Sequence, residues 1–576
     1  MKHVWNKKKI ISLFLMAFMC TVPILFNQHI VYAAGEAEAS ITNSISTVNL
    51  STKMKIASIT KESRYAPSNL RKSPASATDK SIVLIWEKPA EYSNITGYTI
   101  YSGNKKIGET DKTYYKVQGL NEDTKYKYVI KAHDVNEFES ISSNEVTIKT
   151  EKTGKILNIK DYGAVGNGIT KDTESIQKAI DACPKGGTVL LLEGKYLSGA
   201  LYLHSDMTFY VAKNAQLIPS SELKDYPFTS ARHDIEDIYD PNSPTLGNPA
   251  FSSLLNAGNM DHNKGATTQN IKILGEGTIG DKSNGLALRV AYDAFCADTV
   301  NNKASHYGGG SLISLKNCSN VYMDGIHIQN GMMWTIVPVY SSYITSYNLD
   351  ITTTVHNGDG FNPNSSTNIY MLENSFTTGD DCSAIKSGKD AEGREIGRPS
   401  TNIYYRGCVF NAGHGGITCG SEMSGGISDV FAEDCTLVPV DINTKATNPG
   451  IRVKVSPSRG GYIRNLKVRD SICNKISVIT NYDKQAGATQ GVSLPDISNF
   501  KFDNLTAPEG NSTYILDLNG ANFGSSVSYL KDLQFTKCSF YKANLNFCEN
   551  VLFKNCSFKN GITKTGCINI QEQLGE

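Results

Sequence analysis

Hydrophobic and polar positions alternate in short runs beyond Gly187, and these runs share a weak repeat. Each copy starts with Asn or Asp and a β-branched residue, continues with alternating apolar positions, and ends on Cys or Ser before Phe or Leu. The copies begin at Asn270, Asn320, Asn368, Asn402, Asp429 and Asn550. Where no insertion intervenes they lie roughly two dozen residues apart, too short a unit to bury its own apolar face. The units must therefore stack, and the pattern predicts an all-β fold, a right-handed parallel β-helix.

One helical pattern precedes the repeats. Residues 170–180 place apolar side chains at helical spacing after a capping residue, and Pro184-Lys185-Gly186-Gly187 stops the pattern. We expect this helix to cover the open end of the coil. A β-propeller is the weaker alternative for the long region, because its repeat is longer and carries a different signature.

Residues 65–150 carry short alternating strands with turn residues between them, which predicts a small β-sandwich. The clearest strands are 81–86, 97–101 and 126–131. Trp86, Tyr98 and the segment 120–126 resemble a fibronectin type III domain, which implies that Trp86 is a core residue and Tyr126 the tyrosine-corner residue. No residue here suggests chemistry. We expect a spacer or accessory role, with glycan binding by exposed tyrosines as the alternative.

The N-terminus is typical of an exported protein. A lysine-rich start precedes the apolar run Ile10–Phe26, and Val31 and Ala33 suit a cleavage site. We predict a signal peptide over residues 1–33, a flexible linker over 34–64, and a secreted, extracellular protein. The alternative is an uncleaved membrane anchor, because the run is at the short limit for spanning a bilayer. No later segment is apolar enough to span a membrane.

Composition narrows the function without identifying it. The 576 residues have a formal net charge of +1, which gives no case for nucleic-acid binding or for bulk attraction to a polyanion. Any affinity for an acidic ligand must come from a few locally placed cations. Removing Cys20 with the signal peptide leaves twelve of the 13 cysteines, which either form disulfides or stack as buried thiols. None is spaced as a zinc site, and we expect no cofactor and no metal.

Three carboxylates occur at the spacing of one coil turn. Asp380-Asp381 lies 21 residues after Asp359, so stacking places all three on one wall. Hydrolysis of a glycosidic bond needs a carboxylic acid to protonate the leaving oxygen and a carboxylate to activate water. Clustering raises the pKa of one carboxyl and keeps it protonated as the acid. Adjacent strand residues face opposite ways, so both aspartates reach one cleft only if the chain bends, which Gly379 permits.

Basic residues follow on later turns. His414 lies between two glycines, where the backbone can turn tightly beside a ligand and the ring can bond to a carboxylate or a sugar hydroxyl. Arg452 and Lys454 alternate on a predicted strand and project from one face, suited to bind a uronate carboxylate. A solitary histidine is more often structural, and strands often carry a solvated pair of cations. The combination with the carboxylates is what indicates an acidic-polysaccharide hydrolase.

Four motifs in this order resemble glycoside hydrolase family 28, the polygalacturonases: Asn357-x-Asp359, Gly379-Asp380-Asp381-Cys382, Gly413-His414-Gly415 and Arg452-x-Lys454. The resemblance covers residues 155–576 and implies a parallel β-helix catalytic domain that cleaves the α-1,4 bonds of polygalacturonate with inversion. It implies that the catalytic residues are Asp380 as general acid, Asp359 and Asp381 holding and activating the water, and His414 in an auxiliary role. The implied substrate-binding residues are Asn357, Arg452, Lys454 and Tyr482.

Two features depart from that family's pattern. Asn362 stands where many relatives have Asp, which removes a negative charge near the acid–base trio and alters the acid's pKa or the preferred substrate. Long segments at 228–264 and 386–400 flank the expected cleft. We expect them to close one end, with Arg394 or Arg398 on a terminal carboxylate, and therefore exo action. Endo action is the alternative, in which these loops only shield the solenoid.

Three rival functions stay open. A pectate lyase shares the fold but needs a calcium site and a base that abstracts a proton, and no calcium-loop signature is present. A rhamnogalacturonan hydrolase is poorly separated by sequence, and a non-catalytic glycan-binding β-helix would not need the aspartates. The expected partner is an acidic polysaccharide, with neither nucleic acid nor membrane involved after signal cleavage, and the expected state is a monomer.

Overall fold

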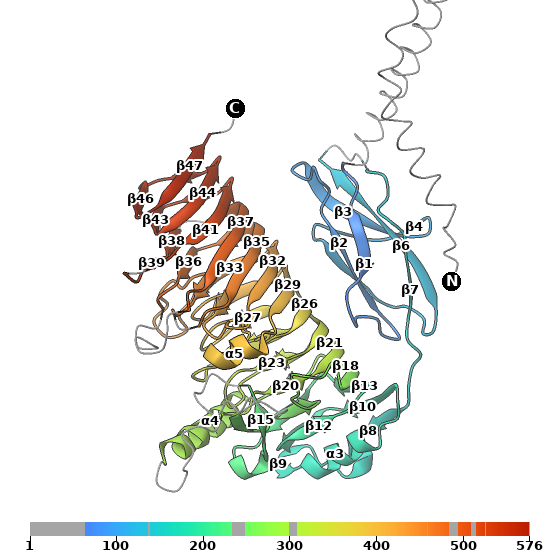
Figure 1. Cartoon of the computed structure of the whole chain (residues 1–576). Helices are drawn as coiled ribbons and strands as arrows, with labels where there is room; N and C mark the ends of the chain where they lie inside the picture. Colours follow the sequence, from blue (N-terminus) through green and yellow to red (C-terminus); the bar gives the residue numbers. More distant parts are fainter. Residues whose placement is uncertain are drawn as a thin grey trace, which may run out of the picture.

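The computed structural model describes residues 64–135, 139–232, 248–298, 308–457, 459–482, 493–508, 514–524 and 526–574. The predicted signal peptide and the predicted linker up to residue 63 lie outside these residues. A small sandwich stands beside a long coil that runs from α3 (Thr173–Asp181) at one end to β47 (Ile568–Gln573) at the other (Figure 1). No helix in the described part of the chain is long and apolar enough to cross a membrane.

The N-terminal domain is an antiparallel two-sheet sandwich, as the sequence predicts. One sheet has the order β1 (Ser68–Lys72), β2 (Ile82–Glu87), β5 (Tyr114–Val117), and the other β4 (Lys105–Thr110), β3 (Ile95–Ser102), β6 (Lys125–Asp134), β7 (Val146–Lys149). Trp86 is fully buried and meets the Tyr98 ring edge-on at 5.4 Å. The Tyr126 hydroxyl accepts the N–H of Asn121 at 2.9 Å, which confirms the predicted tyrosine corner.

The rest of the chain winds into parallel sheets, which confirms the β-helix. Between residues 268 and 506, each successive turn of the coil opens with a strand of one 23-stranded sheet. These strands are β18 (Thr268–Gly275), β21 (Cys318–Asp324), β24 (Ser342–Tyr347), β26 (Thr367–Leu372), β29 (Ser400–Arg406), β32 (Ile427–Glu433), β35 (Tyr462–Cys473) and β37 (Asp496–Thr506). Its other strands are β8 (Ile156–Asn158), β9 (Asn167–Lys171), β10 (Gly187–Leu191), β11 (Gly194–Ser198), β13 (Met207–Val211), β14 (Ala215–Pro219), β19 (Thr278–Ile279), β22 (His327–Ile328), β25 (Asp350–Thr352), β27 (Ser375–Thr377), β30 (Val409–Ala412), β33 (Thr436–Val440), β41 (Leu530–Thr536), β44 (Cys548–Lys554) and β47.

Two shorter parallel sheets form a second side of the coil, called here the cleft wall. The first contains β12 (Leu201–Leu203), β17 (Leu255–Ala257), β20 (Ile313–Lys316) and β23 (Ile336–Val339). The second contains β28 (Ser383–Ile385), β31 (Ile417–Gly420), β34 (Ile451–Lys454), β36 (Lys475–Ile479), β38 (Ile515–Asn519), β43 (Lys542–Asn546) and β46 (Ile562–Thr565). Bridges at Phe361 and Asn364 join the two sheets into one continuous wall.

A ladder of Asn and Asp side chains runs along the large sheet. Asn270, Asn320, Asn368, Asn402, Asp429, Asn465 and Asn499 occupy one register line with φ between +56° and +59°. Asn and Asp enter this left-handed region more readily than other side-chain residues. Their side chains also bond along the ladder, as where Asn465 Nδ2 donates to Asp429 Oδ1 at 2.9 Å. These two demands explain why each repeat begins with Asn or Asp.

The helix α3 closes the end of the coil, as predicted, with Ile176, Ala179 and Ile180 buried in the common core. It starts three residues later than the predicted range, because residues up to Lys171 extend as β9. The Asp172 carboxylate does not cap the helix; it accepts the N–H groups of Val165 and Gly166 at 2.7 and 3.0 Å. The tertiary bonds therefore override the local capping signal.

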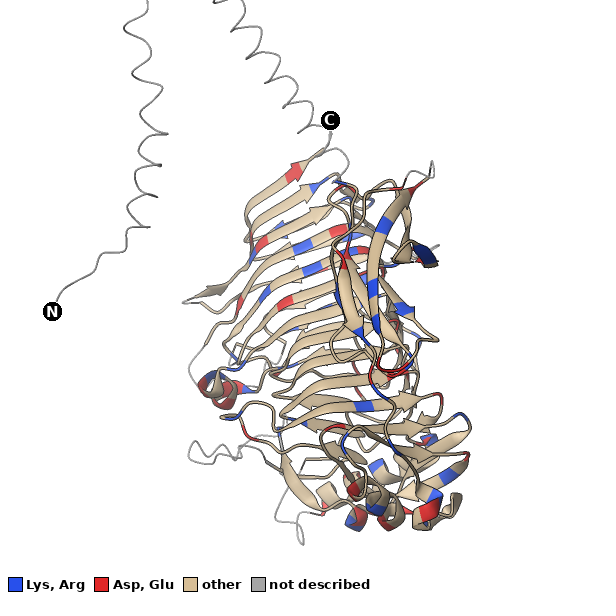
Figure 2. Ribbon diagram, turned by 90° about the vertical axis from the view of Figure 1, so that its right-hand side faces the viewer, with Lys and Arg blue, Asp and Glu red and all other residues tan. Residues whose placement is uncertain are grey.

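The sandwich docks on the large sheet, which Figure 2 shows behind it. Between them the Arg406 guanidinium is fully buried, with Nε 3.2 Å from Glu433 Oε1 and Nη2 2.9 Å from Glu87 Oε1. Lys88 Nζ lies within 3 Å of two carboxylates on the coil, Asp434 at 2.9 Å and Asp470 at 2.7 Å. This contact could not be predicted, because it joins sandwich and coil residues more than 300 positions apart.

All twelve cysteines of the described residues are free thiols, and nine of them are buried. Cys408 and Cys435 lie on neighbouring turns, since the N–H of Thr436 donates to the carbonyl of Cys408 at 2.9 Å. Of the two alternatives for the cysteines, the structure has the stacked thiols. Cys382 belongs to a different column, on the cleft wall, where its Sγ lies 3.0 Å from the Ala412 carbonyl.

Candidate active site

The three aspartates meet on adjacent turns of the cleft wall. The N–H of Gly360 donates to the Asp381 carbonyl at 3.1 Å, and the N–H of Cys382 donates to the Gly415 carbonyl at 2.8 Å. Asp359, Asp381 and Gly415 are therefore neighbours along the coil. The spacing of 21 residues is one turn, as the sequence predicts.

A bend at Gly379 and Asp380 separates the two adjacent aspartates. His414 Nδ1 lies 3.0 Å from Asp380 Oδ1, and the backbone N–H of His414 donates to the Asp380 carbonyl at 3.0 Å. The hydrogen bond to Asp380 raises the pKa of His414, against an opposing effect of burial. Asp380 is thereby fixed beside a ring that can hold or pass a proton.

The Asp381 side chain contacts two cations instead of the histidine. Lys454 Nζ lies 2.8 Å from its Oδ2, and Arg452 Nη1 donates to its Oδ1 at 3.2 Å. Burial acts to raise the pKa of Asp381, but Lys454 and Arg452 outweigh it and leave the pKa below its usual value. Asp381 is therefore the carboxylate that stays ionised.

Asp359 is 2% exposed and has the opposite electrostatic environment. Burial raises the pKa of Asp359 well above its usual value, and Asp380 adds to the effect, while Lys386 and Lys454 oppose it. The pKa values of Asp359 and Asp381 are thus shifted in opposite directions although the two carboxyls share one cleft.

Gly415 is needed for this packing. A Cβ at this position would lie 2.4 Å from Thr418 Oγ1 and 3.0 Å from both Arg452 Cδ and Asp381 Oδ1. Any side chain would therefore push apart the carboxylate and its cation. The second glycine of the Gly-His-Gly motif is explained by this contact.

Lys386 is a site residue that the sequence interpretation missed. Its buried Nζ lies 2.6 Å from Glu422 Oε2 and 4.4 Å from the centre of the Trp334 ring. Its positive charge acts to lower the pKa of both Asp359 and Asp381, against the effect of burial. The signal was available: Lys386 follows Ile385, which pairs through Cys419 with Val453, so it shares the register of Lys454.

Tyr482 and Asn357 complete the predicted set. The exposed Tyr482 ring lies near both cations, with its centre 5.5 Å from Arg452 Cζ and 5.4 Å from Lys454 Nζ. Asn357 occupies the turn before Asp359 with φ +54°. That turn is held by α4 (Lys282–Ala297), whose Arg289 donates to the carbonyl of His356. The structure thus brings the predicted residues to one wall, while their individual roles stay predictions.

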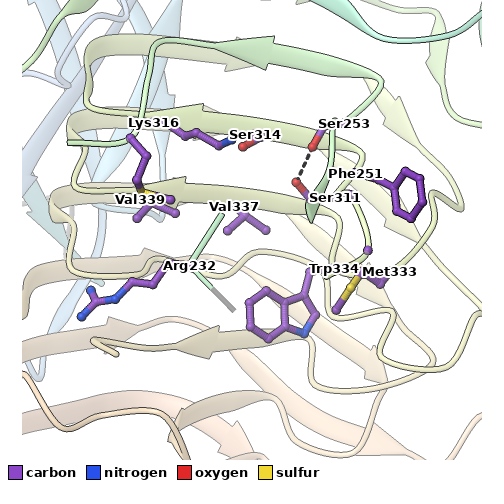
Figure 3. A pocket seen from close by; sticks show the side chains of 13 residues that line it. Arg232, Phe251, Ser253, Ser311, Ser314, Lys316, Met333, Trp334, Val337 and Val339 are labelled. Atoms are coloured by element: carbon purple, nitrogen blue, oxygen red, sulfur yellow. Dashed lines mark hydrogen bonds between the residues drawn. The ribbon is translucent and has the colours of Figure 1, made fainter. Parts of the chain in front are cut away.

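The cleft wall is covered at β23, on the turn next to Asp359. The side chains of Val337 and Val339 on β23 are only 5% and 2% exposed, packed in a cluster with Met260, Tyr340 and Ile396. Ile396 ends α5 (Asp390–Ile396), the short helix of the 386–400 segment, which lies on the side of the coil away from the sandwich (Figure 1). A small pocket of about 20 Å³ is lined there by Arg232, Trp334 and Val337 (Figure 3), a volume that holds about one water molecule.

Ion pairs tie α5 in place. Arg232 forms a bidentate ion pair with Glu392, in which Nε donates to Oε1 at 2.7 Å and Nη2 donates to Oε2 at 2.9 Å. Arg459 Nη1 bonds to Asp390 Oδ2 at 2.7 Å. The two arginines proposed from sequence for a terminal carboxylate bond to the protein here: Arg394 to the Arg459 carbonyl at 3.0 Å and Arg398 to the His262 carbonyl at 2.8 Å.

Comparison with known families and proteins gives consistent results. The model of glycosyl hydrolases family 28 matches residues 245–557, and that of the fibronectin type III domain matches residues 65–149. An exo-poly-alpha-D-galacturonosidase of Dickeya chrysanthemi is 30% identical over 473 residues, 72% of this chain and 75% of that protein. An endo-polygalacturonase of Pectobacterium carotovorum subsp. carotovorum is 27% identical over 384 residues, 64% of this chain and 85% of that protein.

Solved structures agree on the fold. The family 28 exopolygalacturonase of Yersinia enterocolitica has a TM-score of 0.70 at 23% identity, covering 88% of this chain and 99% of that one. A hyperthermoactive exopolygalacturonase of Thermotoga maritima has a TM-score of 0.53 at 24% identity, covering 72% and 92%. At these identities the likeness establishes the sandwich and coil architecture.

Proposed function

Because the chain belongs to glycosyl hydrolase family 28, we propose that it is a secreted enzyme that hydrolyses polygalacturonate from a chain end with inversion. Membership of this polygalacturonase family makes the chain a glycosidase and favours pectin as its substrate. The observation that carries the proposal is the trio of carboxyls on adjacent turns, one ionised by two cations and one bonded to a histidine.

Each carboxyl has a task in this proposal. Asp380, whose side chain is 15% exposed and bonded to His414, protonates the leaving glycosidic oxygen. Asp381 and Asp359 hold the attacking water on the opposite side of the sugar and accept its proton. His414 orients Asp380 and supplies the route by which it is reprotonated.

The cations account for an acidic substrate. Arg452 and Lys454 flank the exposed ring of Tyr482, so a uronate can place its carboxylate on the cations and its ring on the tyrosine. A neutral polysaccharide would bring no carboxylate to these cations, whose positive charge exceeds that of the single Asp381 carboxylate they share. The arrangement favours galacturonan over rhamnogalacturonan, in which only alternate residues carry a carboxylate.

Exo action is supported by the cover over β23. A polymer that crosses an open cleft needs the wall free on both sides of the aspartates, and Ile396 of α5 packs on the cluster that buries the outward side chains of β23. The 30% identical relative from Dickeya is an exo enzyme, whereas relatives of both kinds match this chain. Endo action therefore remains the second candidate.

Product analysis over time on polygalacturonate tests the proposal. We expect one short product from the first minutes, detected by anion-exchange chromatography, and the β-anomer as its initial form in proton NMR. A ladder of oligomers would mean endo action, and an initial α-anomer would refute inversion. Ultraviolet-absorbing products lost on adding a chelator would mean elimination by a lyase. Recovery of a mature chain beginning at Ala34 from the culture medium tests export.

A further inference from the structure

Asn362 is locked in one orientation beside Asp359. The side chain is fully buried. Its Oδ1 accepts the N–H of Ala384 at 3.2 Å, so its Nδ2 must face Asp359, where it donates to Oδ2 at 2.8 Å. The backbone N–H of Asn362 is also occupied, on the Ile336 carbonyl at 2.8 Å. No rotation of the amide is open that keeps both side-chain bonds.

Burial disfavours the ionised form of Asp359, so the groups that favour its carboxylate determine whether that form is populated. Asp380 and Asp381 are the negative groups that face Asp359, and Lys386 and Lys454 are the positive ones. Both lysines are shared, Lys454 with Asp381 and Lys386 with Glu422. A side-chain amide carries no titrating proton, so it is a hydrogen-bond donor at every pH. Its N–H therefore favours the ionised form of the carboxylate that accepts from it.

We propose that Asn362 is a positioning residue that holds Asp359 in the ionised, correctly oriented form needed to activate water. This inference rests on the proposed function, in which Asp359 is one of the two water-binding carboxylates. An aspartate at position 362 would keep the bond from Ala384 but turn its second oxygen toward Asp359. The two carboxyls would then need a shared proton. Once that proton is released, the hydrogen bond between them is lost and two carboxylates repel each other.

Two substitutions should move the pH profile of kcat in opposite directions. Asn362→Leu has nearly the same shape but no N–H donor, so the pKa of Asp359 rises further and activity is lost from the acidic side. We expect the acidic limb to move up by about one to two pH units, the value of one hydrogen bond to a charged group. Asn362→Asp should keep activity at low pH, where the pair shares a proton, and lose it as the pH rises.

The shape of the profile separates positioning from a merely structural role. Loss of kcat by the same factor at every pH in both variants would overturn the inference, as would profiles identical to that of the native protein. Reducing-end release from polygalacturonate is the measurement. Circular dichroism at each pH restricts the comparison to folded protein.

A stability cycle tests the pairing without any activity. Asn362→Asp alone places two carboxyls together, whereas the double variant Asp359→Asn/Asn362→Asp exchanges the amide and the carboxylate and keeps one donor and one acceptor. At pH 7 we expect the single variant to unfold at lower denaturant than the native protein, and the double variant to recover most of the loss while remaining inactive. A double variant no more stable than Asn362→Asp would overturn the pairing. If native protein does not hydrolyse polygalacturonate, the proposed function fails while this cycle still decides the inference.

Discussion

At the residue scale, the site depends on one bend that sends adjacent carboxyls to different partners. Asp380 bonds to His414, and Asp381 bonds to Lys454 and Arg452. Neighbouring strand residues ordinarily face opposite sides of a sheet, so the bend at Gly379 is what gives both a place in the cleft. Their different partners then give them different surroundings, an imidazole for Asp380 and two cations for Asp381.

Asp380→Asn preserves the shape of the side chain and removes its proton. We expect kcat on polygalacturonate to fall by about 10² to 10⁴, the usual contribution of a general acid, with KM nearly unchanged. Reducing-end assays and substrate binding by calorimetry measure the two effects. Asp350→Asn is the control, because Asp350 forms an exposed pair with His327 at 3.2 Å on the large sheet. Turnover retained by Asp380→Asn would remove Asp380 from the role of acid.

At the element scale, the Asn ladder shows what the repeat encodes, and one position breaks it. Tyr343 lies between Asn320 and Asn368 in the ladder, with φ +56° and nearly half of its side chain exposed. A left-handed tyrosine costs about 1 kcal/mol relative to a residue that enters this region readily. It also interrupts the bonds between neighbouring amides.

Tyr343→Asn should therefore raise the stability of the protein by about 1 kcal/mol. Thermal or denaturant unfolding of the two proteins measures the difference. Tyr343→Ala is the matched variant, since it removes the ring without favouring the left-handed backbone. An Asn variant that is no more stable than the Ala variant would contradict this account of the ladder.

Elements whose signal is local could be predicted from the sequence, and elements set by distant contacts could not. Asn320 and its equivalents carry the coil, and four short motifs carry the site, because each requirement acts within a few residues. Lys386 was not predicted as a site residue, because its role depends on the register of its strand with that of Lys454, two turns away. The start of α3 differs from the prediction because the residues up to Lys171 form β9, which pairs with β11 on the next turn.

At the scale of the whole molecule, the sandwich and coil share a buried ionic contact. Arg406 and Glu433 are both fully buried, and the Arg406 Nη1 also donates to the Thr113 carbonyl at 3.2 Å. A spacer on a free linker would not need such a contact. The spacer or accessory role stays a prediction, and the docked contact is what a spacer role has to account for.

Arg406→Met should destabilise the protein by about 3 kcal/mol, because it leaves Glu433 buried with less compensating charge. Unfolding experiments measure the loss, and limited proteolysis near residues 151–155 reports whether the sandwich has loosened. Arg464→Met is the control: its pair with Asp496 is exposed, so we expect a change below about 1 kcal/mol. Equal effects of the two substitutions would argue against a docked sandwich.

The cover over β23 has a consequence for the substrate solution as a whole. An enzyme that admits only chain ends shortens each polymer by one step at a time, so the average chain length hardly falls while sugar accumulates. The viscosity of polygalacturonate should then stay near its starting value at an extent of hydrolysis at which random cleavage would thin the solution. Viscometry run beside the reducing-end assay would show it, and the rate should rise with the number of chain ends at constant polymer mass.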